Sequence, residues 1–198
     1  SVINFNPFFD IKSNIEINKL DRKIFDRIEV KKILNNHEIL KRFNSQTKIN
    51  YNKKKKIKHI IHNYLFNIEL EHGRLFFLSN IDILGGKIKC SGNSFLLEQY
   101  PRLNFKCIVE TSESERILKK FLIKKKMNKD LQNLNIIGSI NILNNKINFK
   151  NIFIGKTYKA KKEELNYFKK VVEEILLDET LLDAFKKNKI KKFLIEII

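Results

Sequence analysis

The sequence predicts an α+β fold: a mainly antiparallel meander sheet, curved into an open groove, with amphipathic helices between strand groups and at the C-terminus. Three observations support this prediction. Apolar and polar residues alternate through most of the first 155 residues, which is the period of a strand with one buried face. Turn residues separate many of these runs. In the remaining segments apolar residues recur at three- and four-residue steps, the period of an amphipathic helix.

The N-terminal segment begins with strands and continues into helix. Apolar residues alternate at Ile3, Phe9, Ile11, Ile15 and Ile17, and Pro7 marks an edge position or an interruption. From Asp21 the spacing changes to three and four residues. We therefore expect one or two helices that start at an Asp21 N-cap and reach about Phe43.

The middle of the chain is predicted to be a series of hairpins. The expected strands cover residues 47–51, 62–71, 74–84, 87–91 and 103–111. Turns are expected at His72–Gly73 and at Gly85–Gly86, because glycine adopts positive φ at low cost. Consecutive hairpins of this kind make a meander in which each strand pairs with its sequence neighbour.

The rest of the chain is predicted to contain a helix, a last hairpin and a helical end. Residues 112–127 carry acidic residues first and lysines last, in the order that suits a helix dipole. Residues 135–143 and 146–154 form a strand pair around Asn144–Asn145, and the last forty residues have helical spacing. We divide the chain into a strand-rich segment, 1–155, with inserted helices, and a helical C-terminal segment, 156–198.

The charge of the chain suggests an anionic partner, but its distribution weakens the suggestion. Lys and Arg number 40 against 22 Asp and Glu, a formal net charge of +18. Such an excess is typical of proteins that bind nucleic acid or anionic membranes. Here most of it is lysine spread through a chain rich in Lys, Asn, Ile and Phe, as an AT-rich coding sequence would produce. Nucleic acid is therefore disfavoured as a partner, although it is not excluded.

Four consecutive lysines form the densest basic run, Lys53, Lys54, Lys55 and Lys56. Like charges in a row repel one another, so a solvated turn is the favoured interpretation. The functional alternative is a weak rim that attracts anionic headgroups.

The sequence contains no recognisable catalytic or metal-binding motif. The patterns GxxxxGK, GxGxxG, GxSxG and HExxH are all missing. His59 and His62 are three residues apart on a segment that alternates like a strand, which places them on opposite faces. We therefore predict a protein that is not an enzyme and that uses no cofactor and no metal.

Two cysteines, Cys90 and Cys107, lack the CxxC spacing of a zinc site. The favoured interpretation is two small apolar residues on strands. A disulfide between them would require facing strands and an oxidising compartment.

The predicted strands share a pattern that suggests a binding surface. Apolar residues occupy one parity of each strand, while lysine and asparagine occupy many of the positions between them. Either helices cover this apolar side, or the sheet forms a trough that can hold an acyl chain. The candidate lining residues are Leu75, Phe77, Ile81, Ile83, Ile88, Leu103, Phe105, Val109, Ile140, Ile142, Ile147 and Phe149.

Three stretches resemble the strand ladders of AsmA-like proteins of bacterial envelopes. They are the opening "INFNPFFDIKSNIEINKLD", residues 67–92 "NIELEHGRLFFLSNIDILGGKIKCSG" and residues 136–155 "IIGSINILNNKINFKNIFIG". The order also resembles the C-terminal part of such proteins. The likeness covers roughly residues 1–155 and rests on pattern, since the family has no catalytic signature.

The resemblance implies a periplasmic segment of an inner-membrane-anchored protein, whose anchor lies outside this sequence. It implies a long groove that holds or conducts phospholipid for outer-membrane maintenance, with acyl chains and bacterial membranes as partners. Two alternatives stay open: a basic nucleic-acid-binding module, and a structural interaction domain whose helices close its core.

Overall fold

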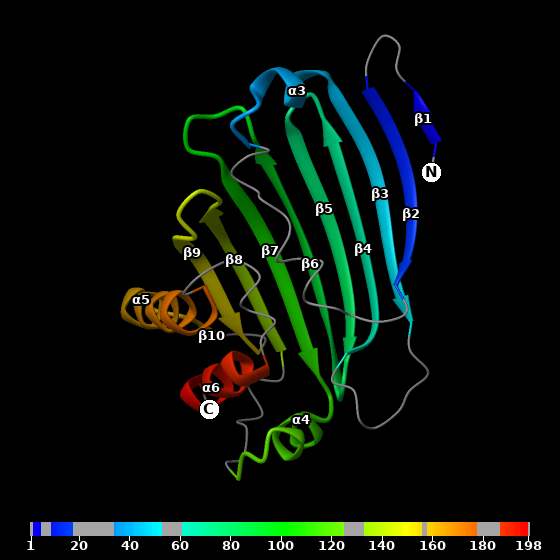
Figure 1. The fold of residues 1–198 in the computed structure, drawn as a ribbon. Coiled ribbons are helices and arrows are strands. Elements are labelled where there is room, and N and C mark those ends of the chain that lie inside the picture. Colours follow the sequence, from blue (N-terminus) through cyan, green and yellow to red (C-terminus); the bar gives the residue numbers. More distant parts are fainter. Residues whose placement is uncertain are drawn as a thin grey trace.

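One open sheet dominates the molecule. The computed structural model describes residues 2–4, 9–17, 34–52, 61–124, 133–155, 158–177 and 187–197. Ten strands form the sheet, and their spatial order follows the sequence from β1 to β10. β1 and β10 lie at opposite edges, so the sheet is not closed on itself (Figure 1). The predicted mainly antiparallel sheet with a few helices is confirmed.

The strands and helices have these bounds. The strands are β1 (Val2–Asn4), β2 (Phe9–Ile17), β3 (Phe43–Asn52), β4 (Ile61–Glu71), β5 (Arg74–Ile83), β6 (Gly86–Phe95), β7 (Arg102–Thr111), β8 (Asn133–Asn141), β9 (Ile147–Ile154) and β10 (Tyr158–Lys159). The helices are α3 (His37–Arg42), α4 (Ser114–Lys120), α5 (Lys162–Val171), the π-helical segment η2 (Val172–Leu176) and α6 (Lys187–Ile197).

Tight turns join the central strands where the sequence predicts them. Between β4 and β5, His72 and Gly73 both have positive φ, 48° and 79°. That pair is the signature of a type I′ hairpin turn, whose twist matches the twist of the flanking strands. Gly85 has a φ of 81° in the turn between β5 and β6. β3 to β9 therefore form the antiparallel meander.

One strand pair departs from the meander. β2 and β3 are parallel, from Phe9 beside Phe43 to Ile17 beside Tyr51. A parallel pair needs a long connection that returns the chain to the same end of the sheet. Only the end of the helix expected over residues 21–43 is described, because residues 18–33 lie outside the described ranges. There α3 starts after Asn36, whose side chain accepts a hydrogen bond from the Ile39 amide at 3.3 Å, and Phe43 belongs to β3.

Two other boundaries differ from those that the sequence predicts. α4 begins at Ser114 and ends at Lys120, inside the predicted 112–127. The C-terminal segment is not wholly helical, because β10 pairs with β9 before α5 begins. A two-residue strand is too short to show a period, so it is identified only by its pairing partner.

The buried apolar side chains lie near the ends of the strands and around β9 and α5. Leu34, Leu40 and Leu96 form one cluster, against which Leu70 and Leu75 pack. Leu118, Phe121 and Ile123 form another, which connects α4 to α6 through Ile190 and Leu194. The described helices therefore cover parts of the sheet rather than its whole width.

A disulfide joins the two central strands β6 and β7. Cys90 and Cys107 are directly opposite each other in the register, and their sulfurs are bonded. The interpretation of these cysteines as unbonded small apolar residues was therefore wrong, although both lie on strands as expected. Strand pairing brought together two residues separated by 17 positions in sequence.

Candidate functional site

The strand register collects the candidate lining residues on one side of the sheet. Directly paired residues point to the same side, so a chain of pairs defines one transverse row. Phe77 pairs with Gly92, Gly92 with Phe105, Phe105 with Gly138, and Gly138 with Phe149. Phe77, Phe105 and Phe149 thus lie in one row across five strands.

The other candidates lie in parallel rows on the same side, which we call the apolar face. Ile81 pairs with Ile88, and Ile88 pairs with Val109. Nearer the α3 end, Leu103 pairs with Ile140, and Ile140 pairs with Ile147. Leu75 and Ile83 share the parity of Phe77 and Ile81 on β5.

Ile142 is the exception among the candidates. It follows β8 in a turn and packs against the cluster of Leu34, Leu40 and Leu96. Its side chain therefore belongs to the core at one end of the sheet, and its alternation with Ile140 does not continue as a strand.

The apolar face extends further than the candidate set. β4 contributes Tyr64, Phe66 and Ile68, which pair with Ile81, Ser79 and Phe77. β3 and β2 add Ile49 beside Phe66 and Ile15 beside Ile49. Alternation was visible in β2, but in β4 three consecutive large residues, residues 64–66, hide the period. The register was needed to assign them to faces.

Most of this face is neither buried nor fully exposed. Of the candidates, Ile147 is 4% exposed, while Phe77, Ile88 and Phe105 are half-buried. Helices of the described chain cover the face only in part, α3 at the Leu70–Leu75 pair and α5 beside β9. The central rows are therefore the part of the face that no described helix covers.

Two glycines on this face leave space into which neighbouring aromatic rings extend. A Cβ on Gly138 would lie 2.9 Å from Cζ of Phe105, and a Cβ on Gly92 would meet the Phe77 ring. Each ring therefore leans over the glycine of the neighbouring strand. Phe77 also packs against Phe66, and Phe105 against Phe149, with ring centroids 5.9 and 6.4 Å apart. The result is two pairs of aromatic rings across the sheet, with Gly92 between Phe77 and Phe105.

The polar groups described on the apolar face are mainly hydroxyls, among them Ser13 and Thr47, whose oxygens are hydrogen-bonded at 2.9 Å. Burial raises the pKa of the Tyr64 phenol to about 12, although its hydrogen bond with Ser79 acts in the opposite direction. The phenol therefore stays neutral near physiological pH. Cys90 and Cys107 share this parity with Phe105 and contribute an apolar disulfide rather than thiols.

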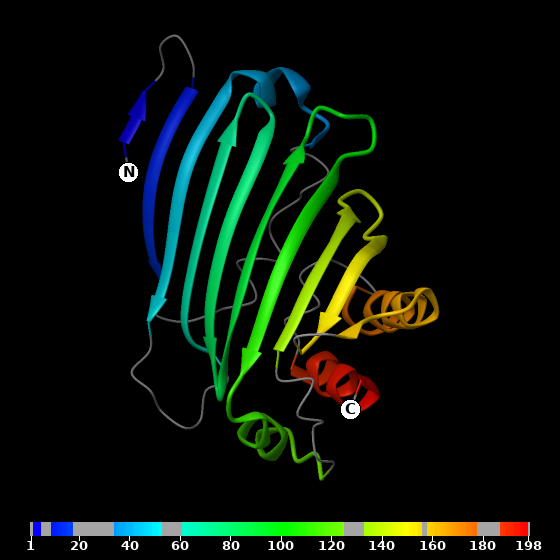
Figure 2. The same ribbon diagram turned by 180° about the vertical axis from the view of Figure 1, so that it is seen from behind.

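The opposite side of the strands, which we call the polar face, carries no described helix over β2 to β8 (Figure 2). Its charges nearly balance along β2 to β7. The basic residues are Lys12, Lys48, Arg74, Lys87, Lys89, Arg102 and Lys106, and the acidic residues are Asp10, Glu16, Glu69, Glu71, Asp82 and Glu110. The excess of +18 therefore comes mainly from sequence outside these strands. The lysine run at 53–56 lies outside the described residues.

Two open hollows lie on the polar face. One, of about 480 Å³, is bordered by Phe76, Leu78, Ile137 and Lys106. The other, of about 400 Å³, lies over β2 and β3 beside Lys12 and is lined by residues of β1 to β4. Phe76 is 44% exposed, so the first hollow presents apolar surface to solvent on an otherwise polar side. The sequence had not singled out this hollow.

The described residues offer no obvious catalytic machinery. They contain no group of three or more His, Cys, Asp or Glu side chains that could hold a metal ion. Within the same ranges, no helix combines the length and apolarity needed to cross a membrane. Comparison with protein-family models, curated proteins and solved structures finds no significant match. The chemistry of the site has to be argued from its own geometry.

Proposed function

We propose that this chain is a non-enzymatic segment that binds phospholipid acyl chains on its apolar face. The observation that carries the proposal is the register, which aligns apolar side chains in rows from β2 to β9 and leaves the central rows half-buried. The AsmA-like resemblance points to the same class of ligand. On that basis the segment serves an envelope protein that moves phospholipid for outer-membrane maintenance.

The geometry suits a ligand without specific polar groups. Each methylene that leaves water contributes about 0.8 kcal/mol, so an acyl chain can bind without directed hydrogen bonds. At about 4.8 Å between neighbouring strands, the face from β2 to β9 spans roughly 34 Å. The strip of rings and glycines along Phe77, Phe105 and Phe149 gives a chain a smooth path across it.

The disulfide supports a location outside the cytoplasm. Such bonds persist in oxidising compartments, of which the bacterial periplasm is one, and are rare in reducing ones. Cys90 and Cys107 are the only cysteines of the chain, and they are bonded to each other. A periplasmic segment fits this chemistry better than a cytosolic nucleic-acid-binding module does.

The charge distribution gives a second argument against nucleic acid. Proteins that bind single strands on a sheet combine a positive groove with stacking aromatic side chains. Here most rings lie on the apolar face, and the polar face, although it exposes Phe76 and Phe95, nearly balances its charges rather than forming a positive groove. Lysines outside the strands can still attract anionic headgroups, at about 1 kcal/mol each near a charged membrane.

The test is lipid extraction from detergent-free protein followed by mass spectrometry. We expect stoichiometric phospholipid in the wild type and a severalfold lower content in Phe77→Asp, because a carboxylate on the apolar face opposes acyl contact. Phe76→Asp is the matched control: the same residue type is changed at the adjacent position of β5, on the polar face. It should retain its lipid.

Each outcome of this comparison is informative. If Phe76→Asp loses its lipid and Phe77→Asp keeps it, the lipid binds at the hollow on the polar face instead of on the apolar face. A folded wild type that carries no lipid contradicts the proposal and favours a structural domain. If Phe77→Asp does not fold, Ile83→Asp, nearer the end of β5, replaces it.

A further inference from the structure

The turn that ends α4 holds a leucine in a conformation that usually belongs to glycine. The Ile123 amide donates to the carbonyl of Leu118 at 2.9 Å. The Leu122 amide donates to the carbonyl of Lys119 at 3.1 Å. These two bonds define a Schellman motif, and Leu122, with a φ of 56°, occupies its left-handed position, which is most often glycine. The other described non-glycine residues with positive φ are a histidine and an asparagine, which adopt it more readily than leucine does.

The side chain of Leu122 is almost fully in solvent. It is 83% exposed, whereas its neighbours Phe121 and Ile123 are buried. Both neighbours pack with Leu118 in the cluster that connects α4 to α6, so the turn is held on either side of Leu122. A glycine here would remove both the backbone cost and the exposed apolar surface. Strain that persists at such a position points to a function.

Lysines flank this leucine. Lys119, Lys120 and Lys124 lie close to it in sequence, and residues 116–124 contain no acidic side chain. Glu115, in the first turn of α4, lies 3.9 Å from Lys119, an exposed contact that is worth little in water. We call Leu122 and these three lysines the α4 tip. Figure 1 shows α4 beyond the end of β7, at the end of the sheet opposite α3.

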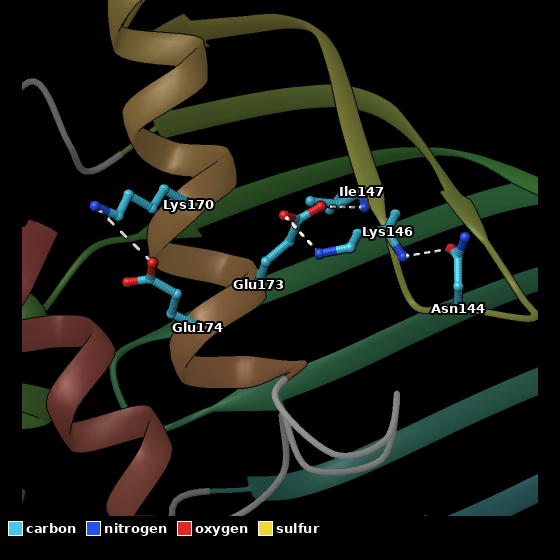
Figure 3. Close-up of polar contacts among 6 residues, drawn as sticks. All are labelled: Asn144, Lys146, Ile147, Lys170, Glu173 and Glu174. Carbon is cyan, nitrogen blue, oxygen red and sulfur yellow. Dashed lines mark hydrogen bonds and ion pairs between the residues drawn. The ribbon is translucent and has the colours of Figure 1, made fainter.

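The lysines near η2 are arranged differently. Lys146 lies 3.7 Å from Glu173, whose other carboxylate oxygen accepts a hydrogen bond from the Ile147 amide at 2.9 Å. Lys170 lies 3.9 Å from Glu174 (Figure 3). That region therefore balances charge within itself and is bonded to the sheet. The α4 tip, in contrast, combines an excess of positive charge with an exposed apolar side chain.

We propose that the α4 tip docks the chain on a bilayer that contains anionic phospholipid. Leu122 enters the acyl-chain region, while the lysines leave their ammonium groups among the headgroups. Nucleic acid fits this surface less well, because leucine offers neither a stacking ring nor a hydrogen bond. The gain in partitioning is about tenfold for the leucine and about fivefold for each lysine, so docking is weak and reversible.

Tryptophan fluorescence tests the docking directly. The sequence contains no tryptophan, so Leu122→Trp introduces the only indole. With vesicles of phosphatidylglycerol and phosphatidylcholine its emission should shift to the blue, and lipids brominated on their acyl chains should quench it. Leu78→Trp is the matched control, because Leu78 is also an exposed leucine, on the polar face of β5. No shift in Leu122→Trp, or an equal shift in both variants, contradicts the proposal.

Vesicle sedimentation separates docking from folding. Leu122→Gly should bind the same vesicles about tenfold more weakly. Its urea midpoint should rise, because glycine adopts the left-handed conformation without the steric cost. Lys124→Gln should weaken binding to these vesicles about fivefold and leave binding to pure phosphatidylcholine unchanged. Unchanged vesicle binding in Leu122→Gly, or a lower urea midpoint, would give Leu122 a structural role instead.

This inference does not depend on lipid binding by the apolar face. Phe77→Asp should still sediment with vesicles, since it leaves the α4 tip unchanged. Leu122→Ala should show the opposite pattern, with its extracted lipid retained and its vesicle binding weakened. If Phe77→Asp loses vesicle binding and Leu122→Ala keeps it, the bilayer contacts the apolar face and the inference is wrong.

Discussion

The two edges of the sheet show two ways in which a strand can end a sheet. At the C-terminal edge, β9 is flanked by β10 and α5, and Ile147 and Ile152 are both 4% exposed. At the N-terminal edge, β1 is the one described strand on the outer side of β2, and Ile15 is 44% exposed. Both strands contain three isoleucines, so the difference comes from the elements that flank them.

The contrast shows how helices and their side chains hold the C-terminal edge in place. α5 carries its own support through α6, because the hydroxyl of Tyr167 donates to Oε1 of Glu196 at 2.7 Å. Lys159 adds a contact with the Phe153 ring, its ammonium 5.9 Å from the ring centroid. The C-terminal edge is thus held by helices as well as by strand pairing, while the described side-chain contacts at the N-terminal edge, such as Ser13 with Thr47 and Phe9 with Phe43, run between strands.

The largest expected effect is a difference in stability between the same substitution at the two edges. Ile152→Ala should lower the free energy of unfolding by about 3 kcal/mol, because it leaves a cavity under α5. Ile15→Ala should cost less than about 0.5 kcal/mol, since its side chain is already exposed. Urea denaturation measures both losses. Similar losses would mean that the side chain of Ile15 is buried in solution.

The next effect concerns the side chain that covers β9. Glu173→Ala should cost about 1–2 kcal/mol, because the Ile147 amide loses its acceptor in a partly buried place. Glu173→Gln should cost less, since it keeps an acceptor. Lys146→Ala should have almost no effect, because that ion pair involves a lysine side chain that is 67% exposed. Urea midpoints at pH 7 rank the three. Equal losses in Ala and Gln variants would show that charge matters more than the hydrogen bond.

The smallest effect is an acid dependence at the start of α5. The Lys161 amide and the Tyr158 hydroxyl, which donate to the Glu164 carboxylate, hold its pKa below 4.5. A carboxyl with a lowered pKa in the folded state stabilises it above its unfolded pKa, and this contribution disappears as the pH falls through the folded value. The first turn of α5 should therefore loosen only in acid.

An NMR titration of the Glu164 carboxyl checks this expectation. The midpoint should lie below 4.5 in the wild type and rise in Tyr158→Phe, which lacks the donor. Tyr167→Phe is the control, because Tyr167 bonds Glu196 and does not contact Glu164. A midpoint unaffected by Tyr158→Phe would show that the Tyr158 phenol does not lower the pKa of Glu164.

Much of the fold could be predicted from local patterns. Alternation located β2, β5, β7, β8 and β9 to within a few residues, and Gly73 and Gly85 marked the hairpin turns, the first of which also ends β4. Parity also assigned most of the candidate lining to one face. These features are local, because a strand's own period states which of its residues share a side.

The features that were missed depend on contacts distant in sequence. The parallel pairing of β2 with β3, the two-residue β10 and the Cys90–Cys107 bond each require knowledge of a neighbouring segment. The Ile147–Glu173 hydrogen bond joins residues 26 positions apart, which no local period encodes.

The sequence by itself therefore determined a sheet with one apolar and one polar side, because side-chain alternation is a property of each strand alone. Only the tertiary structure decided which side chains of neighbouring strands line up in rows and which edge of the sheet the described helices cover. Those outcomes depend on register and on helix docking, which are set by the sum of many weak contacts between distant residues.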